Sequence, residues 1–250
     1  MFPLRDLSPS RGIAIATIAL VLVNVVAFFA WQPHATADAE AEFLYRRAAI
    51  ACEVIERTPI SARDLAAGAC SPGASGARGS EAIFPEKGIA LSIIVSLFLH
   101  GGLLHLLGNM WFLWLFGDNV EAAFGHLGYL LLYAVAGIGG TLAFSALHPT
   151  SIEPMIGASG AIAGVLGAYI VLFPKGWVLT LWVLGILPVP SVVFLGLWFI
   201  GQFSIGTGSV AWEAHVAGFV IGAIVSLLLR ERLLSGRTRA RRSPRAMGMD

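Results

Sequence analysis

Long uninterrupted stretches of apolar residues recur along the whole chain. Six of them are close to the roughly 20 residues that an apolar helix needs to cross a bilayer core about 30 Å thick. They cover residues 12–31, 91–116, 127–147, 156–173, 190–205 and 213–229. We therefore predict an all-α fold, a polytopic membrane protein built as a bundle of six transmembrane helices.

The uncharged stretch 176–212 is long enough for two spans, but we assign only one to it. Pro188 and Pro190 interrupt it, and proline breaks a helix because it has no N–H to donate. The piece before them, residues 177–187, is too short to cross. We expect that piece to lie in the membrane interface.

The segment between the first two spans, residues 32–88, is long and more polar than the spans. Apolar residues at a spacing of three to four predict an amphipathic helix over residues 39–57, and the Gly/Ser-rich stretch 71–80 is typical of a flexible linker. The segment also holds both cysteines of the chain, Cys52 and Cys70. They form a disulfide if this side of the membrane is oxidising, or remain two free thiols; the sequence leaves both open.

The charges exclude a soluble domain and set the orientation. Only 12% of residues are charged, about half the share in a soluble protein. The 16 Lys+Arg and 15 Asp+Glu nearly cancel, which argues against nucleic acid as a partner. Arginines precede the first span and crowd the chain after Leu229, so the positive-inside rule places both termini in the cytoplasm. The Ala-, Gly- and Arg-rich composition suggests the inner (cytoplasmic) membrane of a bacterium.

This orientation divides the chain into parts. Residues 1–11 form a cytoplasmic N-terminus, 12–31 the first transmembrane helix, 32–88 an external loop, 89–230 a core with helices two to six, and 231–250 a basic cytoplasmic tail. The tail after Arg237 has no apolar period, so we expect it to be disordered and solvated, with contact to anionic lipid as the alternative.

Four polar residues inside the predicted spans require an explanation, because a polar group at membrane depth is energetically costly. His105 and Asn109 lie four residues apart and so share one face of the second helix. Ser159 lies near the start of the fourth helix and His215 near the start of the sixth. In this topology all four lie in the outer half of the membrane, at similar depth.

These residue types suit acyl transfer. A serine and a histidine on different helices can form a nucleophile–base pair, and a nearby His and Asn can donate to a developing oxyanion. The alternative for Ser159 is a packing residue, and the small-residue pairs Gly160/Gly164 and Gly218/Gly222 indicate close helix packing by default. Here both meanings agree, because close packing of the fourth and sixth helices would bring Ser159 to His215. The copy of Gly-Ala-Ser-Gly at residues 73–76 has no apolar helix after it and is interpreted as linker.

These motifs, in this order, resemble the rhomboid intramembrane serine proteases over more than half of the chain. The resemblance rests on the segment from His100 to Asn109, on Gly157–Gly160, and on the segment from Ala214 to Gly222. It implies Ser159 as nucleophile and His215 as general base of a dyad without a third acid.

The same resemblance implies further roles. His105, Asn109 and the backbone N–H of Ser159 would form the oxyanion hole. The other residues that it implies are the supporting His100, Gly157, Gly160, Gly218, Gly222 and Glu121, with Glu121 tying the cytoplasmic end of the second helix, and a substrate gate of Trp198, Phe199 and Phe203.

Three positions, at two places in the chain, depart from the family pattern. Leu91-Ser92 stands where the family often has Trp-Arg before the second helix, and Ala163 replaces a tyrosine one turn after the nucleophile. Neither change removes a catalytic group.

The resemblance implies a serine endopeptidase that cuts a peptide bond in or near the transmembrane segment of membrane-protein substrates. No cofactor is indicated, and no Cys/His ligand cluster predicts a metal. A catalytically silent rhomboid-like protein that binds membrane clients is the main alternative, and a transporter with a histidine relay is the second.

Overall fold

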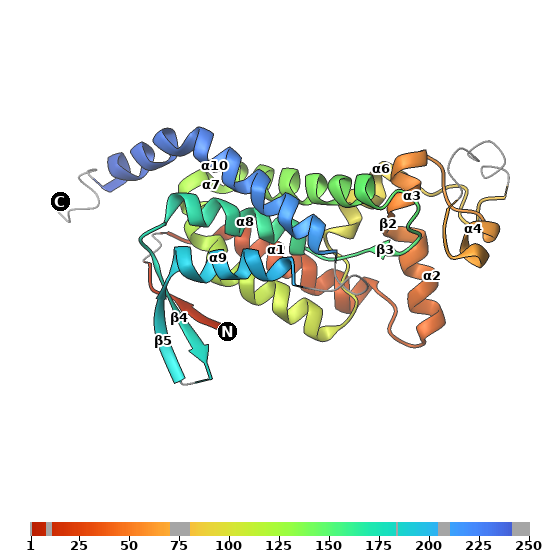
Figure 1. Cartoon of the computed structure of the whole chain (residues 1–250), viewed down its shortest axis with the longest axis horizontal. Helices are drawn as coiled ribbons and strands as arrows, with labels where there is room; N and C mark the ends of the chain where they lie inside the picture. Colours follow the sequence, from red (N-terminus) through yellow and green to blue (C-terminus); the bar gives the residue numbers. More distant parts are fainter. Residues whose placement is uncertain (1, 9–11, 71–80, 184, 205–210, 242–250) are drawn as a thin grey trace.

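The computed structural model describes residues 2–8, 12–70, 81–183, 185–204 and 211–241, with side chains through Ser235. The chain is mostly helical, and its long helices run along the long axis of the molecule (Figure 1). They are α1 (Ile15–Val26), continued by the π-helical turn η1 (Ala27–Trp31), then α6 (Ile89–Ser96), α7 (Leu103–Leu147), α8 (Ser159–Leu172), α9 (Ser191–Gln202) and α10 (Trp212–Arg241).

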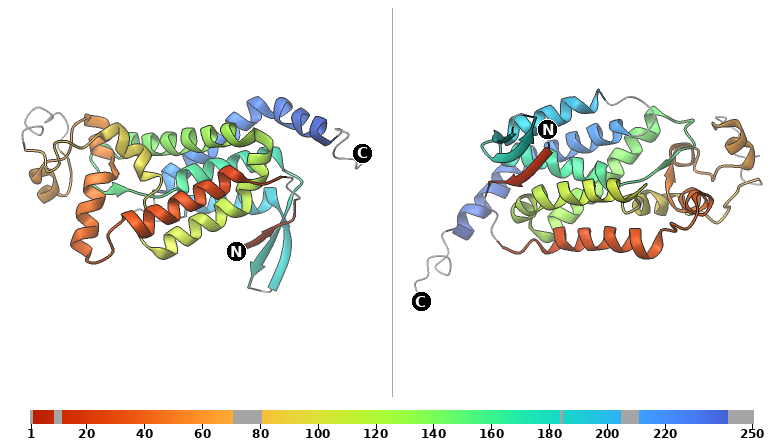
Figure 2. Two further views of the ribbon diagram at one scale, coloured as in Figure 1. Left: turned by 180° about the vertical axis from the view of Figure 1, so that it is seen from behind. Right: turned by 90° about the horizontal axis from the view of Figure 1, so that it is seen from below.

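Two helices of the described residues are long and apolar enough to cross a membrane, namely α7 and the part of α10 from Trp212 to Ser235. Within α7 the backbone breaks at Gly125, whose φ of 71° lies in the left-handed region that glycine adopts without strain. The chain turns back there, so α7 consists of two arms that run in opposite directions (Figure 2).

Helix α8 lies at the centre of the bundle, packed against α7 and α10 (Figure 1). Nearly all of its residues are buried. Glycines allow the close approach, because a Cβ on Gly218 would collide with the carbonyl oxygen of Gly160, and one on Gly222 with that of Gly164. The small-residue pairs therefore bring the backbones of α8 and α10 into direct contact, as van der Waals packing between membrane helices requires.

A small antiparallel sheet departs from the predicted all-α fold. Its strands are β1 (Phe2–Asp6), β4 (Trp177–Trp182) and β5 (Gly185–Pro190), in the order β1-β4-β5. Trp177 pairs with Pro190 across the hairpin, and β-branched and aromatic residues favour β4. Pro188 and Pro190 fall on the edge strand β5, where a residue without an N–H need not interrupt the hydrogen bonds between strands. The hairpin begins against the helices, since Val178 lies in their core, and its far end extends beyond them (Figure 1).

The segment between α1 and α6 contains α2 (Ala37–Arg47), β2 (Ala49–Ile50), α3 (Ala51–Glu56) and α4 (Ala62–Ala67). The prediction of one helix over residues 39–57 is wrong. The chain leaves the helix at Ala48, which is extended, because β2 pairs with β3 (Pro154–Met155) instead. The fully buried Ala49 and Ile50 gain a tertiary contact that an exposed surface helix could not make.

Several contacts hold this segment together. Cys52 and Cys70 form a disulfide, with their Cα atoms 6.2 Å apart, so the first of the two alternatives holds. Both sulfurs lie in a small apolar cluster with Ile50, Ile60 and Ile152. Beside it, Glu53 and Lys87 form an ion pair of 2.5 Å with both side chains 1% exposed. Burial raises the pKa of Glu53 and lowers that of Lys87, and their mutual attraction opposes both shifts.

Other boundaries also differ from the prediction. The span predicted over residues 91–116 is interrupted between Ser96 and Leu103, and helix α8 starts at Ser159 rather than at residue 156. Helix α10 continues past Arg237 to Arg241, where the sequence predicted a disordered tail. The linker predicted over residues 71–80, with its Gly-Ala-Ser-Gly copy, and the last residues of the tail lie outside the described residues.

Candidate active site

Ser159 is the first residue of α8, and the loop before it sets the position of its side chain. Gly157 has a φ of 125°, which side-chain-bearing residues rarely adopt, and its N–H donates to the carbonyl oxygen of Ser96 at 3.0 Å. The first N–H groups of a helix have no acceptor within the helix. Ser159 therefore presents a hydroxyl beside backbone donors.

His215 lies on α10 opposite Ser159. The Nε2 of His215 is 2.7 Å from the Oγ of Ser159, within hydrogen-bond distance. The other ring nitrogen, Nδ1, is 2.8 Å from the Oε1 of Gln202 on α9. Close packing of α8 on α10 places the serine and the histidine at one level, so the two residues that the sequence singled out do meet.

His105 and Asn109 lie on the first arm of α7 and face the same place. The Nε2 of His105 comes within 2.9 Å of where a Cβ on Gly157 would stand. Its Nδ1 accepts from the N–H of Gly101 at 3.4 Å, which favours the tautomer with hydrogen on Nε2. The Nδ2 of Asn109 is buried and has no hydrogen-bond partner among the described residues. Both side chains can therefore donate to an incoming oxygen.

These four side chains line one cleft. Residues of the loop before α8 form part of its wall, including Pro154 and Met155 of β3. The segment that holds the disulfide contacts the same loop, since the N–H of Cys52 donates to the carbonyl oxygen of Ser151 and that of Cys70 to Thr150. The disulfide-bonded segment therefore supports the loop that leads into Ser159.

The supporting residues do not all reach the cleft. The ring of His100 is fully buried and packs edge-on against His105, with centroids 5.1 Å apart. Glu121 lies far along α7, where its carboxylate accepts from the N–H groups of Ala16 and Thr17 at 2.8 and 2.7 Å. Glu121 therefore caps the start of α1 and ties it to α7.

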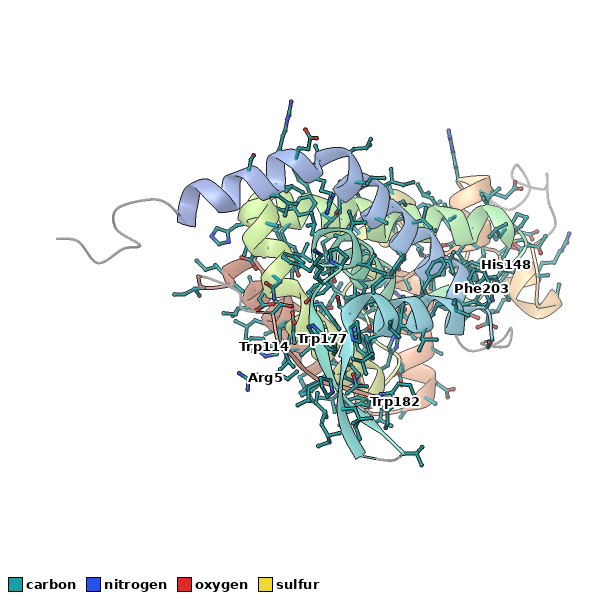
Figure 3. All side chains as sticks on the ribbon, turned by 60° about the vertical axis from the view of Figure 1, so that its left-hand side comes forward. Arg5, Trp114, His148, Trp177, Trp182 and Phe203 are labelled. Carbon is teal, nitrogen blue, oxygen red and sulfur yellow. A yellow bond between two sulfur atoms is a disulfide. The ribbon has the colours of Figure 1, made fainter. Side chains whose placement is uncertain are left out.

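Of the three predicted gate residues, Trp198 lines the cleft, with its ring centroid 6.3 Å from that of His215. Phe199 packs on Phe219 of α10, and Phe203 contacts Trp212 with centroids 5.3 Å apart. Phe203 is 57% exposed and lies toward the same end of the molecule as His148 (Figure 3). Aromatic side chains thus fill the interface between α9 and α10.

Sequence reasoning missed two polar contacts here. One is Gln202, which bonds His215; the signal was present, because a glutamine inside an apolar span is itself a costly polar group. The other is the pair of His148 and Glu213, whose Nε2 and Oε1 are 2.7 Å apart at the edge of the cleft. Within the described residues, His, Cys, Asp and Glu nowhere gather in threes as metal ligands would.

Comparison with known proteins gives consistent matches. A sequence model of the rhomboid domain matches residues 87–232. Rhomboid protein 1, mitochondrial, of Saccharomyces cerevisiae is 35% identical over 144 residues, which are 54% of this chain and 40% of that protein. RHOMBOID-like protein 6, mitochondrial, of Arabidopsis thaliana is 30% identical over 147 residues, 58% of this chain and 45% of that one.

A bacterial match is shorter. Rhomboid protease GluP of Bacillus subtilis is 42% identical over 76 residues, which are 30% of this chain and 14% of that protein. The alignments thus span less than half the length of these curated relatives.

Proposed function

The chain belongs to the rhomboid family, as the domain match over residues 87–232 shows, and from that premise we propose that it is an intramembrane serine endopeptidase. It hydrolyses a peptide bond in or near the transmembrane segment of a membrane-protein substrate. The observation that carries this proposal is the 2.7 Å contact between the hydroxyl of Ser159 and the Nε2 of His215, inside a cleft that also holds two side-chain donors.

The proposal includes the arrangement in the membrane. The chain crosses the inner membrane six times, with both termini in the cytoplasm, residues 32–88 outside, a core over residues 89–230 and a basic tail from residue 231. The opposite placement of two regions supports this orientation. The disulfide-bonded segment lies at one end of the helices, whereas the β4–β5 hairpin and the end of α10 lie toward the other (Figure 1).

The first chemical step is attack on the scissile carbonyl. The Oγ of Ser159 forms a bond to the carbonyl carbon while its proton moves to the Nε2 of His215. The resulting oxyanion accepts hydrogen bonds from Asn109, His105 and the backbone N–H of Ser159. The carbon–nitrogen bond then breaks as His215 returns the proton to the leaving amine. Water hydrolyses the acyl-enzyme through the same base and restores Ser159.

Gly157 allows the oxyanion site to exist. A methyl group at this position would stand 2.9 Å from the Nε2 of His105 and 3.4 Å from the Oγ of Ser159. It would therefore occupy the space between donor and nucleophile where the substrate oxygen must lie. Glycine leaves that space open.

The test is cleavage of a tagged single-pass reporter in proteoliposomes. Wild-type protein should cut it, and Ser159→Ala and His215→Ala should each abolish cleavage. Ser75→Ala, in the other Gly-Ala-Ser-Gly copy, should cut at the wild-type rate. Cleavage by Ser159→Ala would refute the assigned nucleophile.

If the wild-type protein does not cut the reporter, labelling with a fluorophosphonate probe distinguishes two explanations. Labelling that depends on Ser159 and His215 would show an activated serine with an unmatched reporter. Absence of labelling would favour a rhomboid-like protein that binds membrane clients without cutting them.

A further inference from the structure

Gln202 occupies a position that links two helices. It is the last residue of α9, it is 5% exposed, and it lines the cleft. Its Oε1 lies 2.8 Å from the Nδ1 of His215 on α10, and its Nε2 donates to the carbonyl oxygen of Trp198 at 3.0 Å. Both the oxygen and the nitrogen of the Gln202 amide thus have a hydrogen-bond partner.

The second contact determines the direction of the first. A carbonyl oxygen only accepts, so the group of Gln202 that faces Trp198 must be the NH₂, and the group that faces His215 must be the oxygen. An amide oxygen only accepts as well, and therefore Nδ1 of His215 must carry the hydrogen. In a neutral imidazole the remaining nitrogen, Nε2, is then an unprotonated acceptor.

That unprotonated nitrogen is the one beside Ser159. Its lone pair points at the hydroxyl from 2.7 Å and is ready to take the proton. The opposite tautomer would place a hydrogen between Nε2 and Oγ and leave no base. Hydrogen-bond partners select the tautomer of a histidine in this way in other serine hydrolases, where a carboxylate does it.

Within the part of the chain that the structure describes, a glutamine rather than an acidic residue fills this role. Glu213 precedes His215 by two residues on the same helix, but its carboxylate is paired with the Nε2 of His148 at 2.7 Å. His148 and Glu213 lie at the edge of the cleft, whereas Gln202 is the residue in hydrogen-bond contact with Nδ1.

We infer that Gln202 is the positioning residue of the catalytic pair, a neutral third member that holds His215 in its Nδ1–H tautomer and aims Nε2 at Ser159. This inference rests on the proposed function, since it assigns Gln202 a part in the same reaction. Because Gln202 belongs to α9 and His215 to α10, the base is correctly oriented only while α9 is docked on α10.

Two substitutions separate orientation from packing. Gln202→Met keeps the volume but cannot accept from Nδ1–H, whereas Gln202→Glu keeps the acceptor and loses the donor to Trp198. We expect Gln202→Met to lower kcat by about 10- to 100-fold, the loss that one hydrogen bond to a developing imidazolium accounts for. We expect Gln202→Glu to recover most of that loss.

A spectroscopic measurement tests the tautomer directly. In protein labelled with ¹⁵N-histidine, the His215 signals, identified by their loss in His215→Ala, should show the Nδ1–H form in wild type and in Gln202→Glu. In Gln202→Met they should show a mixture of tautomers. A merely structural role for Gln202 would leave these signals unchanged while lowering the thermal stability of both variants.

The outcomes distinguish this inference from the proposed function. If Ser159→Ala is inactive but Gln202→Met keeps the wild-type kcat and the Nδ1–H signal, the positioning role is refuted and the serine–histidine pair stands. If Gln202→Glu is as slow as Gln202→Met with an unchanged tautomer, Gln202 acts through packing and the inference also fails. If Ser159→Ala still cuts, the proposed function fails, whatever Gln202 does.

Discussion

Asn109 allows a sharp test, because its substitution should change activity and stability in different ways. Its Nδ2 is buried in the wall of the cleft, with no hydrogen-bond partner in the described part of the chain. A buried amide donor without a partner costs about 1 to 3 kcal/mol relative to a solvated one. Replacement by leucine removes that cost from the resting protein. We therefore expect Asn109→Leu to be at least as stable as the wild type.

Activity should respond in the opposite direction. In the proposed reaction the same Nδ2 donates to the oxyanion, and loss of one such donor typically costs about 3 to 4 kcal/mol, or about 10²- to 10³-fold in kcat. His105 and the backbone N–H of Ser159 remain, so some activity should persist.

The assay combines reporter cleavage in proteoliposomes with thermal unfolding in detergent. Ser226→Ala is the matched control, because the Oγ of Ser226 is also buried and without a partner among the described residues, but it does not line the cleft. It should leave kcat unchanged. A clear loss of stability in Asn109→Leu, together with a kcat near that of the wild type, would refute the assignment of Asn109 as an oxyanion donor.

Three other predictions follow from the loop before α8 and its support. Gly157→Ala should lower kcat about 100-fold, because its Cβ would displace the Nε2 of His105. It should also lower the melting temperature, because alanine rarely adopts the φ of 125° found there; reporter cleavage and melting in detergent measure the two effects. Lys87→Met should destabilise the protein by about 3 to 5 kcal/mol, because it leaves the carboxylate of Glu53 buried without its partner. The double variant Lys87→Met/Glu53→Gln removes that charge and should be more stable than Lys87→Met alone; equal unfolding curves for the two would contradict this. Replacing Cys52 and Cys70 by serine should lower the free energy of unfolding by about 3 kcal/mol, seen as a lower melting temperature than that of the wild type. Wild-type protein with its disulfide reduced should melt at the same temperature as this double variant.

The placement of the candidate site was largely predictable from local pattern. The apolar stretches located the helices of the bundle, and the family resemblance is confirmed by the domain match. Ser159, His215, His105 and Asn109 could be singled out because polar groups are rare and costly in apolar helices, so each of them signals a specific purpose. The glycine pairs predicted the close approach of α8 and α10 for an equally local reason, the absence of a Cβ.

The errors occurred where partners distant in sequence decide the structure. The hairpin of β4 and β5 was missed because a short apolar run fits a strand or a helix equally well, and only pairing with β1 selects the strand. The helix predicted over residues 39–57 was wrong because β2 pairs with β3, about a hundred residues further along the chain. Neither partner can be recognised from the segment itself.

The chain alone therefore determined which residue types could do chemistry, since hydropathy and spacing are local properties. The tertiary structure alone decided which of them touch. Gln202 shows the difference: the sequence contains a glutamine in an apolar helix, but its hydrogen bond to His215 exists only because α9 docks on α10. Hydrogen bonds act over about 3 Å, and that precision comes from packing rather than from order along the chain.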